Sequence, residues 1–212
     1  MTPRIVVLSA PSGGGKTTIA KTVREQYPDR FGFSVSATTR KPRSGETEGV
    51  DYYFWKPDEF LKGVNHGKFL EHAQYGGELY GTLKSDVQQI LDSGRHVLLD
   101  IEVQGAEQVR KLDPNVLTIF ILPSDPRVLI RRLVERGSET PEQIQQRLER
   151  ATYEIGQATE FQRWIRNDDL QEAVRAVVKA VEDRAGTVVR DRHDIAWLNS
   201  YLKQLKSEQQ KG

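Results

Sequence analysis

The chain has 212 residues, with 31 lysines and arginines, 30 aspartates and glutamates, and a formal net charge of +1. This length is enough for one large domain with a buried core, or for a core with inserted lobes. The balanced charge argues against a general nucleic-acid binder, because such affinity grows with the number of phosphates that a protein neutralises. Any specificity for phosphate must therefore come from local cations.

The sequence has no cysteine, which excludes disulfides and thiolate chemistry, and its four histidines show no metal-ligand spacing. No apolar stretch approaches the roughly 18 residues of a membrane span, and the first residues lack the apolar region of a signal peptide. We therefore expect a cytoplasmic protein with no membrane partner and no nucleic-acid partner.

The first predicted element is a buried strand over residues 4–9, which leads directly into a glycine-rich turn and a helix. The turn matches the pattern G-x-x-x-x-G-K-[ST] of a phosphate-binding loop, except that Ala10 replaces the first glycine. In such a loop, backbone N–H groups converge on phosphate oxygens at the positive end of the helix. The loop consists of Ala10, Pro11, Ser12, Gly13, Gly14, Gly15, Lys16, Thr17 and Thr18. Lys16 adds a cation over the β- and γ-phosphates, and Thr17 is a candidate ligand of Mg²⁺.

The helix after this loop is predicted over residues 16–27 and stops at Pro28. The alternation of strands and helices then breaks. The next segment contains, in order, a strand over 33–36, a loop over 41–45, a strand over 50–55, a helix from Pro57 and a strand over 68–75. Gly76-Gly77 is a two-residue hairpin signal. We interpret residues 34–87 as an inserted lobe of mixed or antiparallel strands.

The alternation resumes with a helix over residues 83–93, which ends at Gly94, and a core strand over residues 96–100. Asp100 ends that strand. Ligands of open α/β sheets gather at the carboxyl ends of the strands, so Asp100 is a candidate ligand of Mg²⁺, directly or through water. The alternative is a helix cap or turn former.

A further apolar strand over residues 116–122 precedes two helices rich in arginine, one opened by Asp125-Pro126 and one opened by Thr140-Pro141. Their arginines are Arg127, Arg131, Arg132, Arg136, Arg147 and Arg150. Arg132 and Arg136 share one helical face and can act on one ligand together. Acidic residues lie among them, so a solvated surface hairpin is one interpretation. The other is a mobile arginine lid that neutralises phosphate charge and excludes water.

The sequence resembles the guanylate kinases across roughly residues 4–184. Besides the phosphate loop, the matching stretches include 34–43, 45–46, 49–52, 69–71, 80–82, 99–105, 132–133, 136–137, 147–148 and 167–170. The resemblance implies an α/β fold of the P-loop NTPase type, with a parallel sheet flanked by helices. It also implies a core formed by residues 1–33, 88–124 and 152–212, a GMP-binding lobe over residues 34–87 and a lid over residues 125–151.

The resemblance further implies an acceptor site for GMP. Arg40 and Arg43, with the hydroxyls of Tyr52 and Tyr80, are similar to a clamp on the phosphate of GMP. Glu71 would accept from N1–H and the 2-amino group of guanine, which adenine does not offer. Ser36 and Thr82 would pair with the guanine, and Glu102 is similar to an acidic residue near the same nucleotide. These last three residues can instead be a turn or sheet hydroxyl or a strand-end cap.

On the donor side, the resemblance implies that Mg·ATP lies in the phosphate loop, with Arg136 and Arg147 closing on its base and phosphates. Asn167 resembles the residue near the adenine. Lys16, Arg40 and Arg132 complete the candidate catalytic cations, which stabilise the transferred phosphoryl group. The implied reaction converts ATP and GMP to ADP and GDP, and dGMP is a second expected acceptor.

Two alternatives from the same resemblance are a phosphopeptide-binding scaffold module and a kinase for another phosphorylated substrate. Scaffold modules typically lose the phosphate-loop contacts, whereas Lys16, Thr17 and Asp100 are present here, and we expect no further domain in this chain. Glu71 favours guanine among substrates. A helix-period segment follows from about residue 192. It predicts either a helix docked on the core or a subunit contact, and the oligomeric state stays open.

Overall fold

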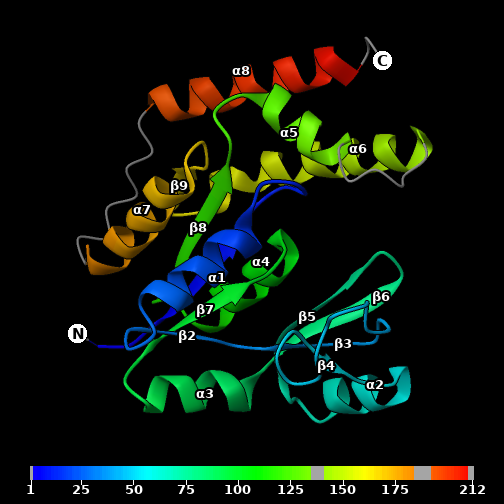
Figure 1. The fold of residues 1–212 in the computed structure, drawn as a ribbon, viewed down its shortest axis with the longest axis vertical. Coiled ribbons are helices and arrows are strands. Elements are labelled where there is room, and N and C mark those ends of the chain that lie inside the picture. Colours follow the sequence, from blue (N-terminus) through cyan, green and yellow to red (C-terminus); the bar gives the residue numbers. More distant parts are fainter. Residues whose placement is uncertain (1, 135–140, 184–191, 210–212) are drawn as a thin grey trace. The chain divides into compact units, whose positions relative to one another are not determined.

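The computed structural model describes residues 2–134, 141–183 and 192–209. They form an α/β fold with two sheets, of strand order β2-β7-β1-β8-β9 and β4-β3-β6-β5 (Figure 1). The strands are β1 (Ile5–Ser9), β2 (Phe31–Phe33), β3 (Ser36–Thr38), β4 (Tyr53–Phe54), β5 (Phe69–Tyr75), β6 (Glu78–Leu83), β7 (His96–Asp100), β8 (Leu117–Leu122) and β9 (Arg163–Arg166). The helices are α1 (Lys16–Gln26), α2 (Pro57–Asn65), α3 (Lys84–Asp92), α4 (Val103–Leu112), α5 (Pro126–Val134), α6 (Pro141–Gly156), the 3₁₀ turn η1 (Gln157–Glu160), α7 (Leu170–Glu182) and α8 (Arg192–Gln209).

The chain divides into two compact units. Unit 1 comprises Met1–Val7 and Arg24–Leu117, and unit 2 comprises Leu8–Val23 and Thr118–Gly212. In unit 1, β2 and β7 pair in parallel, and in unit 2, β8 and β9 do the same. The core strands β1 and β8 are buried along their whole length, as expected for strands that are covered on both faces. The prediction of a parallel central sheet flanked by helices is confirmed.

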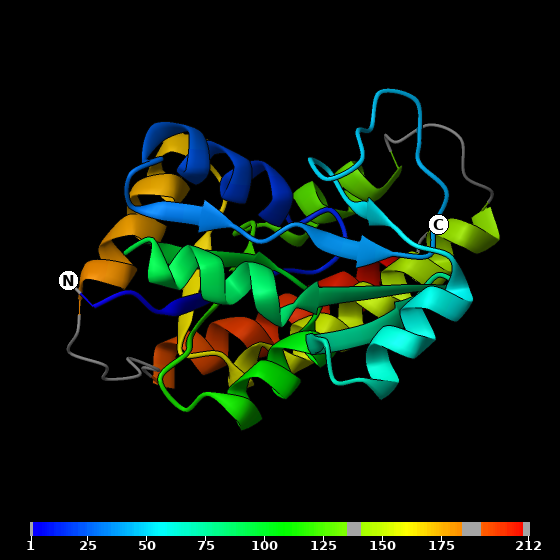
Figure 2. The same cartoon turned by 90° about the horizontal axis from the view of Figure 1, so that it is seen from below.

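The four-stranded sheet of unit 1 has its own apolar cluster. Phe60 of α2 stacks on Phe69 of β5 with 4.4 Å between ring centroids, and Ala37 and Leu83 complete the buried part of the cluster. Figure 2 shows α2, in cyan, beside the hairpin of β5 and β6. Gly76 and Gly77 both have positive φ in the turn of this hairpin, where the sequence places a two-residue connection.

Two strands predicted in this segment have different bounds. Instead of one strand over residues 33–36, β2 ends at Phe33 and β3 begins at Ser36, and each belongs to a different sheet. The strand predicted over residues 50–55 is only β4, because the amides of Val50 and Asp51 bond to the carbonyl of Thr47 in a turn. The lobe is also mixed, since β3 pairs with β4 in parallel and with β6 antiparallel.

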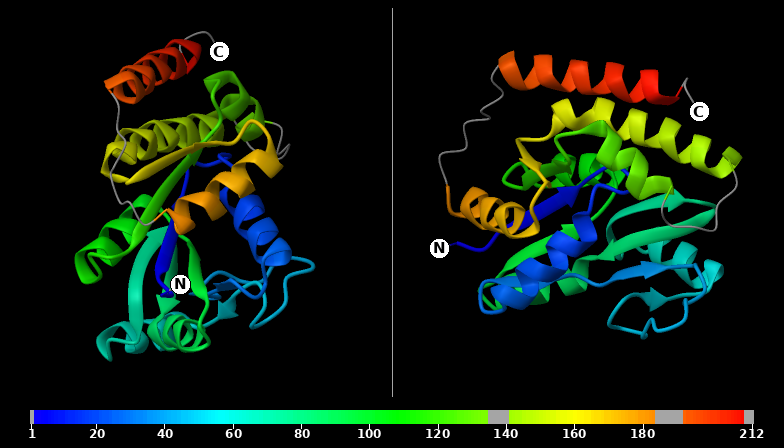
Figure 3. Two further views of the ribbon diagram at one scale, coloured as in Figure 1. Left: turned by 90° about the vertical axis from the view of Figure 1, so that its left-hand side faces the viewer. Right: turned by 45° about the horizontal axis from the view of Figure 1, so that its top comes forward.

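In unit 2, α7 packs on β9, and α8 packs on both α5 and α6. Figure 3 shows α8, in red, running alongside α6 in both views. The helix predicted from about residue 192 is confirmed, and it is docked on other helices of this chain. No helix within the described residues is both long enough and apolar enough to span a bilayer.

Three elements, α4, β9 and α7, are not among those predicted from the sequence. The signal for α7 was available: Asp169 caps it by accepting from the amide of Glu172 at 2.8 Å, which is the N-terminal half of a capping box. The signals for the other two were weak. The sequence of α4 offers no side-chain cap, and β9 is a four-residue strand with an arginine at each end.

Candidate active site

The phosphate-binding loop has the backbone that its glycines permit. Gly13 and Gly15 have φ values of 80° and 89°, a region that L side chains rarely adopt. The amide of Gly14 bonds to the carbonyl of Pro11 at 2.8 Å, and α1 begins at Lys16. A Cβ at Gly14 would lie 2.8 Å from the methyl group of Ala10. The departure from the glycine pattern at Ala10 is therefore tolerated because Gly14 has no side chain.

Two side chains of α6 hold the loop at Ser12. Arg147 donates from Nη2 to Ser12 Oγ at 3.1 Å, and Glu154 Oε2 accepts from the amide of Ser12 at 3.1 Å. Glu154 is 1% exposed, and its other oxygen accepts from Arg150 at 2.9 Å. Arg147 is a predicted site residue and Glu154 is not. Their spacing of seven residues on one helix, which places both on one face, was the signal in the sequence.

Asn167 joins the loop to the end of β9. Its side-chain Nδ2 donates to the carbonyl of Gly14 at 2.8 Å, and its own amide donates to the carbonyl of Leu122 at 3.0 Å. Its carbonyl accepts from Nη2 of Arg132 at 3.4 Å. A Cβ at Gly15 would overlap the Asn167 amide and would lie 3.7 Å from Nη1 of Arg132. Unit 2 thus brings Arg132 and Asn167 to the phosphate loop.

The remaining donor-side residues occupy the start of α1 and the lid segment. Lys16 is half-buried at the first position of α1, and Thr17 and Thr18 beside it are exposed. Arg136 lies outside the described residues. The structure therefore describes every predicted donor-side residue except that one.

In unit 1, three predicted site residues lie in one row across neighbouring strands. Ser36 of β3 is opposite Thr82 of β6, and Thr82 is opposite Glu71 of β5. Opposite residues point to the same face of a sheet. The hydroxyl of Thr82 donates to Glu71 Oε1 at 2.6 Å, and the two side chains are 1% and 4% exposed. A buried carboxylate with a fixed orientation is what recognition of paired N–H donors requires.

The helix α4 leaves room for that carboxylate at Gly105. A Cβ built on Gly105 would overlap Oε2 of Glu71. Gly105 ends the matching stretch 99–105, and no role was predicted for it. Its missing side chain allows the Glu71 carboxylate to lie against the helix. Gly105 is the third residue of α4, and because that helix was not predicted, no signal in the sequence pointed to this role.

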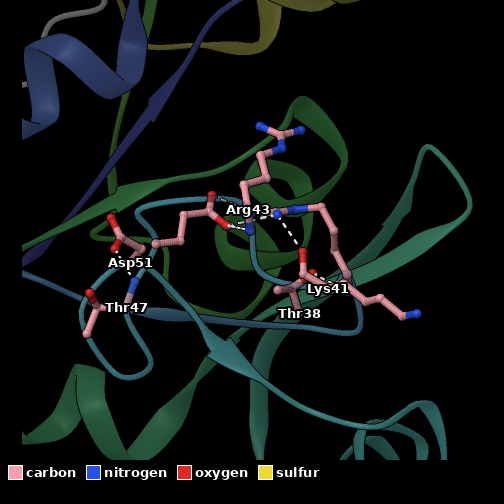
Figure 4. Close-up of polar contacts among 7 residues, drawn as sticks. Thr38, Lys41, Arg43, Thr47 and Asp51 are labelled. Carbon is pink, nitrogen blue, oxygen red and sulfur yellow. Dashed lines mark hydrogen bonds and ion pairs between the residues drawn. The ribbon is translucent and has the colours of Figure 1, made fainter.

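Arg40 is oriented by a carboxylate that was not predicted. Glu46 accepts from both terminal nitrogens of Arg40, at 2.8 and 2.9 Å, and from the amide of Arg43 at 2.7 Å. These bonds lower the pKa of Glu46, the Arg40 bond most, and the pKa of Arg40 is raised above its ordinary value by the same pair. Figure 4 shows this loop, with the side chain of Arg43 extending away from it. The bidentate pair fixes the plane of the Arg40 guanidinium.

Aromatic rings surround Arg40. Its guanidinium lies 5.2 Å from the ring centroid of Tyr52, and the rings of Tyr52 and Tyr80 meet edge to face at 6.0 Å. Tyr80 also contributes to the raised pKa of Arg40. Unit 1 therefore gathers the guanidinium and both tyrosines, which are groups suited to a dianionic phosphate.

Asp100 and Glu102 flank the turn between β7 and α4. Asp100 is the last residue of β7 and is half-buried, and Glu102 is the residue before the first turn of α4. No group of three His, Cys, Asp or Glu side chains suited to a metal occurs within the described residues. Mg²⁺ in kinases takes one or two protein oxygens and completes its shell with phosphate and water. The hydroxyl of Thr17 and the carboxylate of Asp100 are hard oxygen donors of that kind.

Comparison with known proteins decides the family. The family model described as "Guanylate kinase" matches residues 2–184. The chain belongs to the guanylate kinase family. Membership makes it a kinase, a transferase of phosphoryl groups, and it confirms the resemblance seen in the sequence.

Curated relatives in the guanylate kinase family cover most of the chain. A protein named guanylate kinase from Chlorobium chlorochromatii is 46% identical over 184 residues, which are 86% of this chain and 96% of that protein. One from Clostridium perfringens is 43% identical over 173 residues, 82% of this chain and 80% of the relative. The crystal structure of guanylate kinase from Anaplasma phagocytophilum superimposes with a TM-score of 0.72 at 30% identity and covers 94% of this chain and 95% of that one.

Proposed function

We propose that the protein is an ATP:GMP phosphotransferase, which moves the γ-phosphoryl group of ATP to GMP and gives ADP and GDP. The observation that carries this proposal is the buried Glu71, fixed by the hydroxyl of Thr82 in a family whose relatives are named guanylate kinase. We extend the proposal to dGMP as an acceptor, since none of the residues assigned to GMP is assigned to the ribose. The reaction belongs to purine nucleotide metabolism in the cytoplasm.

Glu71 selects guanine by the pattern of hydrogen bonds. Its carboxylate accepts from N1–H and the 2-amino group of guanine, while Ser36 and Thr82 supply hydroxyls in the same row. Adenine has an acceptor at N1 and no 2-amino group, so it leaves a buried charge unpaired. Sites of this kind reject the wrong base by about four powers of ten. Glu102 is assigned to the same nucleotide.

The phosphate of GMP is held by cations and hydroxyls of the same unit. Arg40, Arg43, Tyr52 and Tyr80 form this clamp, and Arg40 is oriented for it by Glu46. Charge-assisted hydrogen bonds of this type are roughly twice as strong as neutral ones. Residues 34–87 are the GMP-binding lobe in this proposal.

The triphosphate of ATP lies in the loop from Ala10 to Thr18, and Asn167 lies near the adenine. Lys16 and three arginines, Arg132, Arg136 and Arg147, neutralise the charge of the transferred group. The three arginines belong to the lid over residues 125–151. When bound, Mg²⁺ shields the negative charge of the phosphates, and Thr17 and Asp100 are the protein oxygens that fit it. The attacking oxygen of GMP is already ionised, so the in-line transfer needs neither a protein nucleophile nor a strong base.

The deciding experiment is release of ADP from Mg·ATP with GMP, dGMP, AMP, CMP and UMP as separate acceptors, followed by chromatography of the products. Conversion of GMP and dGMP alone supports the proposal and the assignment of Glu71. Turnover of another acceptor in place of GMP makes the protein a kinase of different specificity. If no acceptor is phosphorylated while the folded protein still binds GMP, the result favours a phosphopeptide-binding scaffold module over an enzyme.

A further inference from the structure

The helix α8 packs on the two helices that carry candidate catalytic arginines. It begins at Arg192, whereas the family model matches residues 2–184. No role has been assigned to this helix above. It contacts α5, which carries Arg132, and α6, which carries Arg147 (Figures 1 and 3). An element outside the matched segment therefore adjoins the donor side of unit 2.

Trp197 connects α8 to the strand that leads to Asn167. The guanidinium of Arg166, the residue before Asn167, lies 5.2 Å from the centroid of the Trp197 ring. The ring of Trp164, on the same strand, lies 6.4 Å from that of Trp197. Trp164 is itself fixed, because its indole N–H donates to the carbonyl of Ala158 at 2.6 Å. Trp197 thus covers two side chains of β9 within three residues of Asn167.

Tyr201, one turn further along α8, packs on Trp197. Its ring meets that of Trp197 at 5.4 Å, and the residue is 2% exposed. Burial raises the pKa of its phenol most, the charges of Asp125 and Asp168 raise it further, and Arg132 opposes them. Asp168 follows Asn167 and accepts from both the amide and the hydroxyl of Ser124, at 2.8 and 2.5 Å.

The hydroxyl of Tyr201 has no hydrogen-bond partner among the described residues, although it is buried. The contacts of Tyr201 with its neighbours are therefore made by its ring and not by its hydroxyl. This distinction separates two substitutions at one position, because removing an unsatisfied buried hydroxyl is neutral or stabilising, whereas removing the ring leaves a cavity.

We propose that Trp197 and Tyr201 of α8 are positioning residues for the donor nucleotide, which hold Arg132 and Asn167 against the phosphate loop. The proposal rests on the proposed function. Asn167 reaches Gly14 and Arg132 reaches the carbonyl of Asn167, and both contacts start from segments that α8 covers. A displacement of about 1 Å in a catalytic group can cost a hundredfold in rate, so the packing of α8 is expected to appear in catalysis and not only in stability.

The test compares Trp197→Ala and Tyr201→Ala with three controls in the full-length chain. Lys203→Ala changes an exposed residue of the same helix, Val87→Ala removes buried volume from α3 of unit 1, and Tyr201→Phe removes only the hydroxyl. The measurements are Tm, kcat, and KM for ATP and for GMP separately. We expect the two α8 alanine variants to raise KM for ATP about tenfold while KM for GMP changes by less than about twofold.

The controls separate positioning from loss of stability. Lys203→Ala and Tyr201→Phe are expected to keep both KM values. Val87→Ala is expected to lower Tm without changing the ratio of KM for ATP to KM for GMP. The proposal is overturned if the α8 alanine variants change both KM values equally. It is also overturned if, at equal Tm, their ratio of KM for ATP to KM for GMP is the same as that of Val87→Ala. Should an alanine variant fail to fold, Trp197→Phe is the milder substitution to use. If Trp197→Phe folds with a reduced Tm but an unaltered KM for ATP, that result also contradicts the proposal.

Calorimetric binding of a non-hydrolysable ATP analogue provides a readout that does not depend on turnover. Loss of about tenfold in affinity for the analogue in Trp197→Ala supports the positioning role even if the wild-type protein transfers no phosphoryl group to GMP. Failure of the wild type in the acceptor assay overturns the proposed function alone. Unchanged affinity in a folded Trp197→Ala overturns the role of α8 alone.

Discussion

Gly105 leads to a prediction about the guanine site that we propose in unit 1. Substitution Gly105→Ala puts a methyl group where the Glu71 carboxylate lies, so the carboxylate must move and its bond with Thr82 is strained. We expect kcat/KM for GMP to fall about tenfold or more, with KM for ATP unchanged. Steady-state kinetics with each substrate varied in turn is the measurement.

The matched control is Gly156→Ala at the end of α6, where an added Cβ meets nothing within 4 Å and φ is not positive. Alanine is the better helix former by about 1 kcal/mol, so this variant should be at least as stable as the wild type and fully active. Normal use of GMP by Gly105→Ala would show that the position of Glu71 does not limit recognition.

Glu154 gives a second prediction at the residue scale. In Glu154→Gln the side chain keeps its shape, but its contacts with the Ser12 amide and Arg150 lose their charge. Weakening buried bonds to a charged group costs about 1.5–3 kcal/mol, and the loss should appear as a lower Tm and a higher KM for ATP. Glu149→Gln, an exposed change on the same helix, serves as the control. A normal KM for ATP in a destabilised Glu154→Gln would limit Glu154 to a structural role.

At the scale of elements, the loop that carries Arg40 and Arg43 depends on ionised Glu46. The pKa of Glu46 is lowered in the folded protein, so its contribution is present above the ordinary pKa of about 4.3 and is lost as pH falls through the lower, folded value. We expect the amide resonance of Arg43, which bonds to Glu46, to stay constant from about pH 7 to pH 5 and to shift only in stronger acid.

The variant Glu46→Gln provides the control, since its Arg43 resonance should not follow this titration. A midpoint at or above the ordinary glutamate value in the wild type would show that the pair with Arg40 does not hold the loop in solution. Acceptor binding should be weakened in Glu46→Gln as well, because Arg40 loses its bidentate partner.

The elements that the sequence predicted well are those with a strong local signal. Continuous apolar runs predicted β1, β7 and β8, and glycine turns marked the phosphate loop and the hairpin after β5. Where the signal was missing, tertiary structure decides: β3 and β4 are two or three residues long and depend on pairing with each other and with β6. The strand β9 depends on β8 in the same way.

In the candidate site, too, some residues had a signal in the sequence, while the roles of others depend on tertiary contacts. The resemblance to the guanylate kinases indicated Glu71, Thr82, Arg147 and Asn167, and helical spacing indicated Arg132. Each has chemistry that a nucleotide requires. The residues that orient them were not predicted. Glu46, Gly105 and Glu154 act on other groups of the protein and not on a ligand. Their roles depend on contacts between residues up to 142 positions apart, as for Glu154 and the amide of Ser12. Spacing along the chain can place a residue on one face of a helix, but its partner in such a contact is identified only by the structure.

At the scale of the whole molecule, the residues that we assign to each nucleotide lie within one compact unit. Glu71 and Thr82 belong to unit 1, while Gly15 and Asn167 belong to unit 2. A ligand that binds only the native state stabilises it by about 2.7 kcal/mol at a hundred times its Kd. Hydrogen exchange should therefore show that GMP alone protects β3, β5 and β6, and that a non-hydrolysable ATP analogue alone protects residues 10–18 and 163–168.

Exchange in the presence of adenosine and guanosine without phosphate is the control, since neither should protect the phosphate loop. Protection of residues 10–18 by GMP alone, with none in β5 and β6, would contradict the assignment of the guanine site to unit 1.

The contact between Trp164 and Trp197 has a practical consequence for spectroscopy. The chain has three tryptophans, and the third, Trp55, packs in the cluster of unit 1 beside Phe60 and Phe69. In a Trp55→Phe variant, all indole emission comes from the junction of β9 and α8. Undocking of the C-terminal helix would expose Trp197 to water and redden that emission. The protein therefore carries its own optical reporter for this helix, with no dye and no attachment site to engineer.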